Sequence, residues 1–462
     1  MDETDSNASG QASSAPLVPE LPSLAEATRV WIRIGCLSFG GPAGQIALMH
    51  REVVDVQNWI SDRRFLHALN FCSLLPGPEA QQLATYLGWL LHGAKGGLIA
   101  GLAFIIPGAL VMLVLSTIFV TAGEVPAVAA LFFGLKCAVL IIVCEALLRV
   151  ARRALKGRVS WALAMAAFAA LFIFAVPFPL VVLGAAVIGA LGPGWFSGGG
   201  HASLADDGPP AVLDAVMAAD PGYAKGLAKS ARRAGLIALA AWALPLAVLL
   251  PMSGLYADVA WFFSKMAVVT FGGAYAVLAY VAQEAVEGYR WLTAAEMLTG
   301  LGLAETTPGP LILVLQFVGF LAGTGAGSGP SGLAGGLAAS MLTLWVTFAP
   351  CFAFVFLGAP AIERLQDKPV LSGALAAITA AVVGVIANLA LWFGLRVIFR
   401  EMQAFEWSGI SLELPVLQSV DVLALAIAAL AALALFRFKL GVLKTLFLCS
   451  LAGLTLKAGL GW

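Results

Sequence analysis

Seven long apolar stretches, separated by short polar segments, constrain how this chain can fold. A helix needs roughly 20 residues to cross the hydrocarbon core of a bilayer. The stretches are continuously apolar, whereas the strands of a membrane barrel alternate apolar and polar residues. The sequence therefore predicts an all-α polytopic membrane protein surrounded by a lipid bilayer. The predicted spans are Gly97–Val120, Ala127–Leu148, Trp161–Val176, Leu236–Leu250, Leu371–Leu395, Val420–Leu435 and Leu440–Leu456.

The charge and motif content of the chain excludes several classes of function. Only 11% of the residues are charged, against about 25% in soluble domains. Basic and acidic residues balance at 26 each, which argues against a nucleic-acid partner. The sequence has no Walker or Rossmann fingerprint and no nucleophile–base constellation. Its six cysteines are scattered without a CxxC pair. We therefore expect no enzyme activity, no cofactor and no metal site.

An internal repeat divides the chain into two related halves. Residues Phe39–Pro78 align without a gap on Phe271–Pro310 at a constant offset of 232, with 12 of 40 positions identical. The alignment places FGG on FGG at one end and PGP on PGP at the other. We expect a flexible cytoplasmic tail at 1–22, an N-terminal transporter half at 23–192, a polar linker loop at 193–233 and a C-terminal half at 234–462.

The basic residues near the predicted spans predict that the two halves have opposite orientations. Basic residues flank membrane spans mainly on the cytoplasmic side. The chain has two clusters of basic residues next to predicted spans, and we place both on that side. One further span, Leu236–Leu250, then carries the chain outward before the second repeat begins, which makes the topology inverted. With this assignment Arg400 falls on the outer side of the membrane, which argues against the inverted topology. The clusters are Arg149, Arg152, Arg153, Lys156 and Arg158, and Lys225, Lys229, Arg232 and Arg233.

The FGG and PGP motifs predict broken or re-entrant helices. Glycine lacks a restricting side chain, and proline lacks an N–H group and clashes with the preceding turn. Broken backbone at membrane depth is tolerated only inside the protein or around a watery cavity. A helix that restarts there offers free N–H groups and a partial positive charge, which suit an anion. A single break would more often be a simple kink, but recurrence at equal spacing favours a site.

Residues at the breaks are the candidate ligands of such an anion. Glycine amides and hydroxyl or amide side chains can donate to an oxyanion. Taken singly, Ser, Thr and Gln side chains more often hydrogen-bond neighbouring membrane helices, and that alternative stays open. The candidates are Ser38, Gly40, Gly41, Gln45, Gly77, Glu79, Gln81, Thr270, Gly272, Gly273, Tyr275, Thr306, Thr307 and Gly309.

Ionisable residues near the breaks are candidates for coupling and for fixed charge, because such groups inside a membrane are costly and usually functional. Glu52 and Glu284 occupy matched positions, and Glu305 precedes the second PGP. We predict coupling or gating roles for these three carboxylates. Arg33 and Lys265, also matched, are candidate positive charges. The alternatives are interfacial ion pairs for the glutamates and snorkelling to the interface for the cations.

The motifs FGGPAGQ, LLPGPEAQQ, FGGAYAV and ETTPGP together resemble the chromate ion transporter family in its long, two-domain form. The resemblance implies a secondary active transporter that exports chromate across the cell inner membrane and confers chromate resistance, with sulfate as a mimic. It leaves open a sulfate or other oxyanion transporter or exchanger, a passive anion channel, and assembly as a homo-oligomer. The second half departs from the motif, with Ala274 and Tyr275 in place of Pro42 and Ala43 and no equivalent of Gln45.

Overall fold

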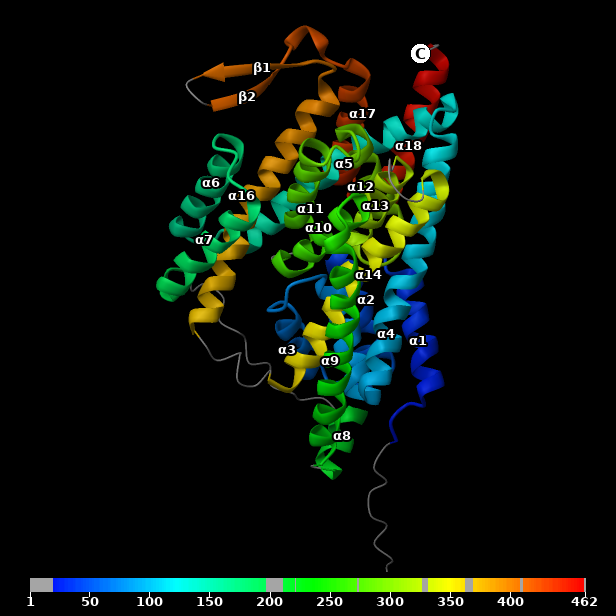
Figure 1. The fold of residues 1–462 in the computed structure, drawn as a ribbon, viewed down its shortest axis with the longest axis vertical. Coiled ribbons are helices and arrows are strands. Elements are labelled where there is room, and N and C mark those ends of the chain that lie inside the picture. The colour runs from blue at the N-terminus through cyan, green and yellow to red at the C-terminus, as the bar shows by residue number, and fades with distance from the viewer. Residues whose placement is uncertain are drawn as a thin grey trace, which may run out of the picture.

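The chain is almost entirely helical, as the sequence predicts (Figure 1). The computed structural model describes residues 20–196, 211–220, 222–271, 274–325, 331–361, 369–407 and 410–460. Gly272 and Gly273, most of the predicted tail and the first part of the predicted linker lie outside the described residues.

The first repeat begins with short helices and a long one that folds back on itself. The backbone leaves helical geometry at His92 and Gly93, and Gly88 lies against the backbone of Gly96. What looks like one helix of 44 residues is therefore an antiparallel pair, Glu79–Leu91 and 94–122, and the second member contains the predicted span Gly97–Val120. The elements are α1 (Leu24–Leu37), α2 (Gly41–His50) with a π-helical turn (Arg51–Val56), α3 (Asp62–Cys72) and α4 (Glu79–Ala122).

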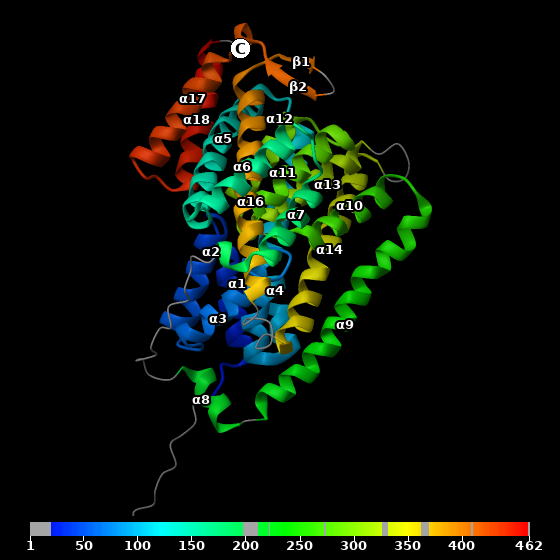
Figure 2. The ribbon, with the colours of Figure 1, turned by 90° about the vertical axis from the view of Figure 1, so that its left-hand side faces the viewer.

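The rest of the first half and the connection follow. The helices are α5 (Pro126–Ala154), α6 (Arg158–Phe172) and α7 (Phe178–Leu191), then a 3-10 turn (Pro193–Phe196), α8 (Val212–Ala219) and α9 (Tyr223–Leu249). The described part of the segment expected to be a linker loop thus contains α8 and the start of α9. Arg64 pairs with Asp214, which holds α8 on α3. Figure 2 shows α9 along one edge of the molecule, and there it packs mainly against α14.

The second half repeats the order of the first, which matches the predicted division into related halves. Its elements are α10 (Leu255–Val269), α11 (Ala274–Gln283) with a π-helical turn (Glu284–Gly288), α12 (Ala294–Thr306), a 3-10 turn (Leu311–Leu313), α13 (Val314–Thr324), α14 (Gly332–Gly358), α16 (Pro369–Ile398), β1 (Met402–Trp407), β2 (Ile410–Pro415), α17 (Val422–Ala432) and α18 (Val442–Leu460). The strands form an antiparallel hairpin that the sequence analysis did not predict.

The two halves exchange their terminal helices. Helix α5 packs against α17 and α18, whereas α16 packs against α6 and α7. Both contacts use facing glycines, Gly134 with Gly453 and Gly189 with Gly373, at which an added Cβ would meet the opposite backbone. Small residues let membrane helices approach this closely. The exchange joins the halves into one packed body.

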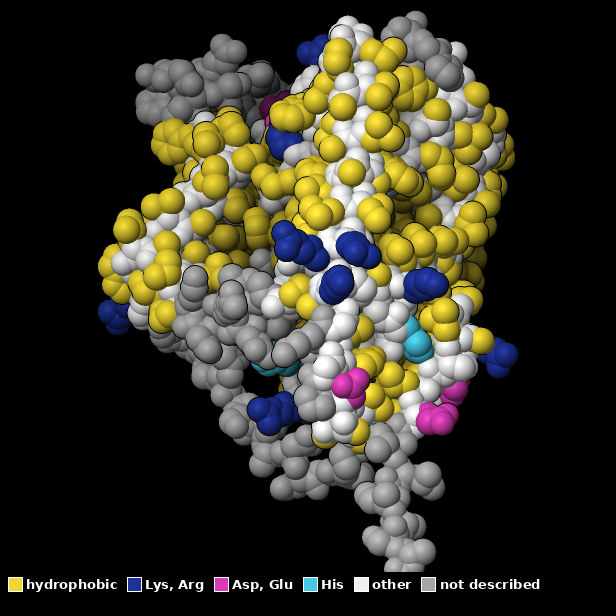
Figure 3. Space-filling model, turned by 60° about the horizontal axis from the view of Figure 1, so that its bottom comes forward, with side chains coloured by type: hydrophobic (Ala, Val, Ile, Leu, Met, Phe, Trp, Pro, Cys, Tyr) yellow, Lys and Arg dark blue, Asp and Glu magenta, His cyan; other side chains and the backbone are white. Residues whose placement is uncertain are grey.

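Among the described residues, five helices are long and apolar enough to cross a membrane, namely α4, α5, a segment from α9 to the following turn, α14 and α16. Large hydrophobic side chains, such as Leu183, Ile237 and Phe447, lie exposed on the outside. Figure 3 shows that apolar surface, bordered on this face by a band of Lys and Arg side chains. An apolar exterior with a basic border is what a bilayer requires, and the protein is a membrane protein.

Candidate functional site

Two re-entrant helical hairpins carry the PGP motifs at their tips. In the first, the Phe71 ring at the end of α3 lies 5.2 Å from the Tyr86 ring in the first part of α4. In the second, the ring of Phe317 in α13 lies against Gly300 of α12. The arms returning from the tips, Glu79–Leu91 and Val314–Thr324, are roughly 15–20 Å long at 1.5 Å per residue, too short to cross a bilayer.

Each hairpin tip is hydrogen-bonded to the broken helix of the opposite half. The Gly77 amide donates to the carbonyl oxygen of Thr270 at 2.9 Å, and the Gly309 amide donates to that of Ser38 at 2.8 Å. Ser38 and Thr270 are the residues directly before each FGG. They are 232 residues apart, and so are the two tip glycines, Gly77 and Gly309. Each PGP tip therefore lies against the predicted FGG break of the opposite half.

Glycine is required at these breaks by the backbone conformation. Gly40, Gly41, Gly77 and Gly309 have φ values of +86°, +74°, +127° and +89°, a left-handed region that residues with a side chain rarely adopt. Helices α2 and α4 then begin without a side-chain cap. Their first-turn N–H groups are the donors that sequence analysis assigned to the anion.

Glutamine side chains make the two half-sites unequal. Gln45 donates to the carbonyl oxygen of Gly309 at 2.6 Å. Val277, at the matched position of the second half, has no side-chain donor for such a bond. Gln82 donates to the carbonyl of its own tip residue Pro76 at 2.7 Å, and Gln81 donates to Thr85. The Oε1 atoms of these three glutamines are buried without a hydrogen-bond partner. The centre thus holds acceptors that could receive a donor from water or from a protonated ligand.

The hydroxyl groups predicted as ligands are engaged within their own helices. Ser38 donates to the carbonyl of Ile34 at 2.6 Å and Thr306 to that of Leu303 at 2.8 Å. Thr270 and Thr307 donate in the same way, to residues four positions earlier. Their protons stabilise helix ends in this conformation, and their role toward an anion stays a prediction.

The matched charges of the two halves have different partners. In the first half, Arg33 forms an ion pair with the buried Glu52. In the second, the ammonium of Lys265 lies 5.3 Å from the ring centroid of Tyr280, and Glu284 interacts electrostatically with Tyr280. The repeat therefore preserves the charges and changes how each is compensated.

A further set of charged side chains lies beside the second tip. Glu305 is buried and accepts a hydrogen bond from the Tyr275 hydroxyl. Glu145 and Arg149 of α5 form an ion pair and interact electrostatically with Glu305. Sequence analysis identified Glu305 and Tyr275, but it used Arg149 only as an orientation marker. The available signal was a Glu–Arg pair four residues apart near the end of an apolar helix.

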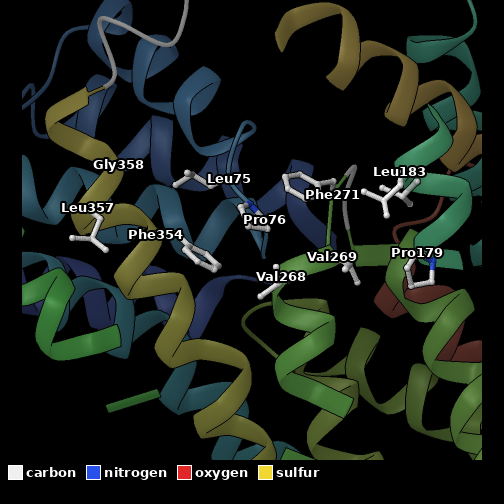
Figure 4. A pocket seen from close by; sticks show the side chains of 11 residues that line it. Leu75, Pro76, Pro179, Leu183, Val268, Val269, Phe271, Phe354, Leu357 and Gly358 are labelled. Atoms are coloured by element: carbon white, nitrogen blue, oxygen red, sulfur yellow. The ribbon is translucent and has the colours of Figure 1, made fainter. Parts of the chain in front are cut away.

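A cavity of about 590 Å³ opens beside the first tip (Figure 4). Its wall is apolar, so an oxyanion would find no hydrogen-bond donor there. The cavity provides space next to the site. Leu75 and Pro76 of the first tip contribute to its wall, together with Pro179, Val182, Leu183, Val268, Val269, Phe271, Phe354, Leu357 and Gly358.

Comparison with known proteins identifies the family. A sequence model of the chromate transporter family matches residues 25–190 and 257–454. The chain belongs to the chromate transporter family. Both matched regions include one FGG break and one PGP tip, so the family pattern covers both halves of the site.

Proteins similar to this member of the chromate transporter family cover most of its length. The "Chromate transport protein" of Pseudomonas aeruginosa is 31% identical over 77% of each chain. A protein of the same description from Cupriavidus metallidurans is 26% identical over 83% of this chain and 85% of its own. The "Probable chromate transport protein" of Synechococcus elongatus is 26% identical over 80% and 85%. No solved structure matches the chain significantly.

Proposed function

We propose that this protein is a secondary active transporter that exports chromate across the inner membrane of the cell. The observation that carries the proposal is the pair of backbone hydrogen bonds from Gly77 to Thr270 and from Gly309 to Ser38. Each bond joins a hairpin tip of one half to a helix break of the other half, inside an apolar body. Such a centre presents the N–H groups of helix N-termini to an anion, whereas the surrounding lipid has no hydrogen-bond donor. The relatives described as chromate transport proteins supply the choice of anion.

Alternating access would arise from movement of the hairpin tips. The repeats are proposed to lie in inverted topology, so that two related conformations open the same centre to opposite sides. Each tip is held to the opposite half by a backbone hydrogen bond worth about 1 kcal/mol, which a moving hairpin can break and remake. The apolar cavity next to Pro76 gives the first tip room to move.

The driving force is proposed to be an ion gradient or the membrane potential. A potential of 100 mV is worth roughly 2.3 kcal/mol for each charge moved. A negative interior therefore favours the exit of a dianion. A sulfate transporter or exchanger remains the second candidate, because sulfate is also a tetrahedral dianion and the same donors would serve it.

Chromate uptake into inside-out vesicles tests the proposal. Vesicles containing the protein should take up chromate saturably when the potential is positive inside, and sulfate should compete. Vesicles from cells lacking the protein serve as the control, and an ionophore that collapses the potential should slow uptake. Flux that rises linearly with chromate concentration would instead indicate a channel, and uptake of sulfate alone would reassign the substrate.

A further inference from the structure

Glu305 is a buried carboxylate with a tyrosine partner on α11 and charged neighbours on α5. It is 4% exposed and accepts a hydrogen bond from Tyr275 of α11. Helix α12 packs directly on α5, where Gly302 leaves no space beside Leu135. Within the described part of the chain, the charged or titratable groups that interact with Glu305 are Tyr275, Arg149 and Glu145.

Helix α5 presents a line of charged side chains toward both hairpins. Glu145, Arg149 and Arg153 are spaced four residues apart and therefore share one face. Arg149 donates to Glu145 through two nitrogens, one of them at 3.2 Å. Its side chain is 45% exposed, and within the described residues its remaining N–H groups have no hydrogen-bond partner. One turn further, Arg153 interacts electrostatically with Glu79, the residue directly after the first PGP.

We propose that Arg149 binds the transported oxyanion and that proton uptake by Glu305 accompanies this binding. A guanidinium presents two parallel N–H groups, which match two oxygens of a tetrahedral oxyanion. Glu145 and Glu305 both compete with the anion for this cation. When solvent supplies a proton to Glu305, one competing negative charge disappears and the dianion is repelled less. The inference rests on the proposed function, because it takes an oxyanion as the substrate.

Linkage makes the effect reciprocal. If protonated Glu305 favours the anion, a bound anion must favour protonated Glu305 by the same factor. The wild-type protein should therefore bind the anion more tightly as the pH falls through the titration of Glu305. Glu305→Gln, which keeps the shape and removes the charge, should bind with an affinity that depends on pH only as far as the anion itself titrates.

Equilibrium binding of radiolabelled chromate to the purified full chain tests the role of Arg149. Arg149→Gln should weaken binding about tenfold or more, the range for a lost charge-assisted hydrogen bond. The affinity of Arg149→Lys should lie between those of the wild type and Arg149→Gln. Arg152→Gln is the matched control, because it removes the same charge from the same helix end, and it should stay within about twofold of wild type.

Glu145→Gln provides a result that misfolding cannot imitate. It removes a competitor for Arg149 and should tighten binding about threefold, consistent with the loss of one partly exposed ion pair. Wild-type affinity in both Arg149→Gln and Glu145→Gln would overturn the inference. So would a Glu305→Gln protein whose pH profile coincides with that of wild type.

The same experiment separates failure of this inference from failure of the proposed function. Wild-type protein is assayed with chromate, sulfate and molybdate before any variant. Binding of sulfate or molybdate without chromate would overturn the chromate proposal, and the variants would then be judged with the anion that binds. Absence of binding by all three anions would overturn both.

Discussion

The amide nitrogen of Gly77 lies 2.9 Å from the carbonyl oxygen of Thr270. The residues at the matched positions of the repeat, Gly309 and Ser38, make the same bond. Each half therefore completes the site of the other. Neither half alone would hold its hairpin tip against a broken helix. This relationship is the basis for the proposal that the two repeats build a single centre.

Valine at either tip glycine should abolish transport. Gly77 has a φ of +127°, and an added Cβ would lie 2.7 Å from Gln82 Nε2 and 2.9 Å from Cys351 Sγ. Backbone strain of this kind costs on the order of 1–3 kcal/mol. Gly77→Val and Gly309→Val should each reduce chromate flux more than tenfold while the protein still reaches the membrane. Gly184→Val, at a site with no atoms nearby, is the control. Normal flux in either tip variant would contradict the role of the tips.

Replacement of Gln45 should loosen the second tip selectively. Gln45→Leu removes the 2.6 Å bond to the Gly309 carbonyl, at a cost of about 1 kcal/mol. Hydrogen exchange should then accelerate at the Gly309 amide and stay unchanged at the Gly77 amide. Gln403→Leu, on exposed β1, should change neither. Equal acceleration at both tips would show that Gln45 does not distinguish the half-sites.

The two matched glutamates should differ in their effect on stability. Glu52 is buried and forms an ion pair with Arg33, whose own side chain is half exposed. Glu284 is less buried and has a neutral partner, Tyr280. Glu52→Gln should lower the free energy of unfolding by about 1–3 kcal/mol, the range for a lost hydrogen bond to a charged group, and Glu284→Gln by less.

Transport measurements on the same two glutamate variants test coupling. If either carboxylate carries or gates protons, its glutamine variant should show a changed pH profile of transport. Wild-type profiles in both would remove Glu52 and Glu284 from the coupling role and leave Glu305 as the remaining candidate.

Inverted topology predicts that Ser23 and Ser253 face opposite sides of the membrane. Both residues are exposed; Ser23 directly precedes α1, and Ser253 lies two residues before α10. In a cysteine-free background, Ser23→Cys should react with an impermeant thiol reagent from the cytoplasmic side and Ser253→Cys from the outside. Labelling of both from one side would show that the repeats are parallel.

Much of the fold was predictable because its signals are local. Continuous apolar runs identified the spans of α5 and α16, and FGG and PGP located the breaks. The reversal at His92 and Gly93 was missed because this glycine-rich segment lies among apolar residues and no proline marks it. The β1–β2 hairpin was missed although ISLELP alternates apolar and polar residues with the period of a strand.

The partners of the site residues were not predictable, because they depend on tertiary packing. No local pattern shows that Gln45 reaches Gly309 across 264 residues, or that Glu52 pairs with Arg33 rather than with its neighbour Arg51. Arg149 was interpreted from its position near a helix end alone. Only the packing of α12 on α5 brings it to Glu305.

The stoichiometry of chromate binding tests the central claim most directly. If the tips of both halves build one shared centre, purified wild-type protein should bind one chromate per chain in equilibrium dialysis. Gly77→Val alone and Gly309→Val alone should then each lose binding completely. Two chromates per chain in wild type, with one remaining in each variant, would show two independent sites and contradict the account.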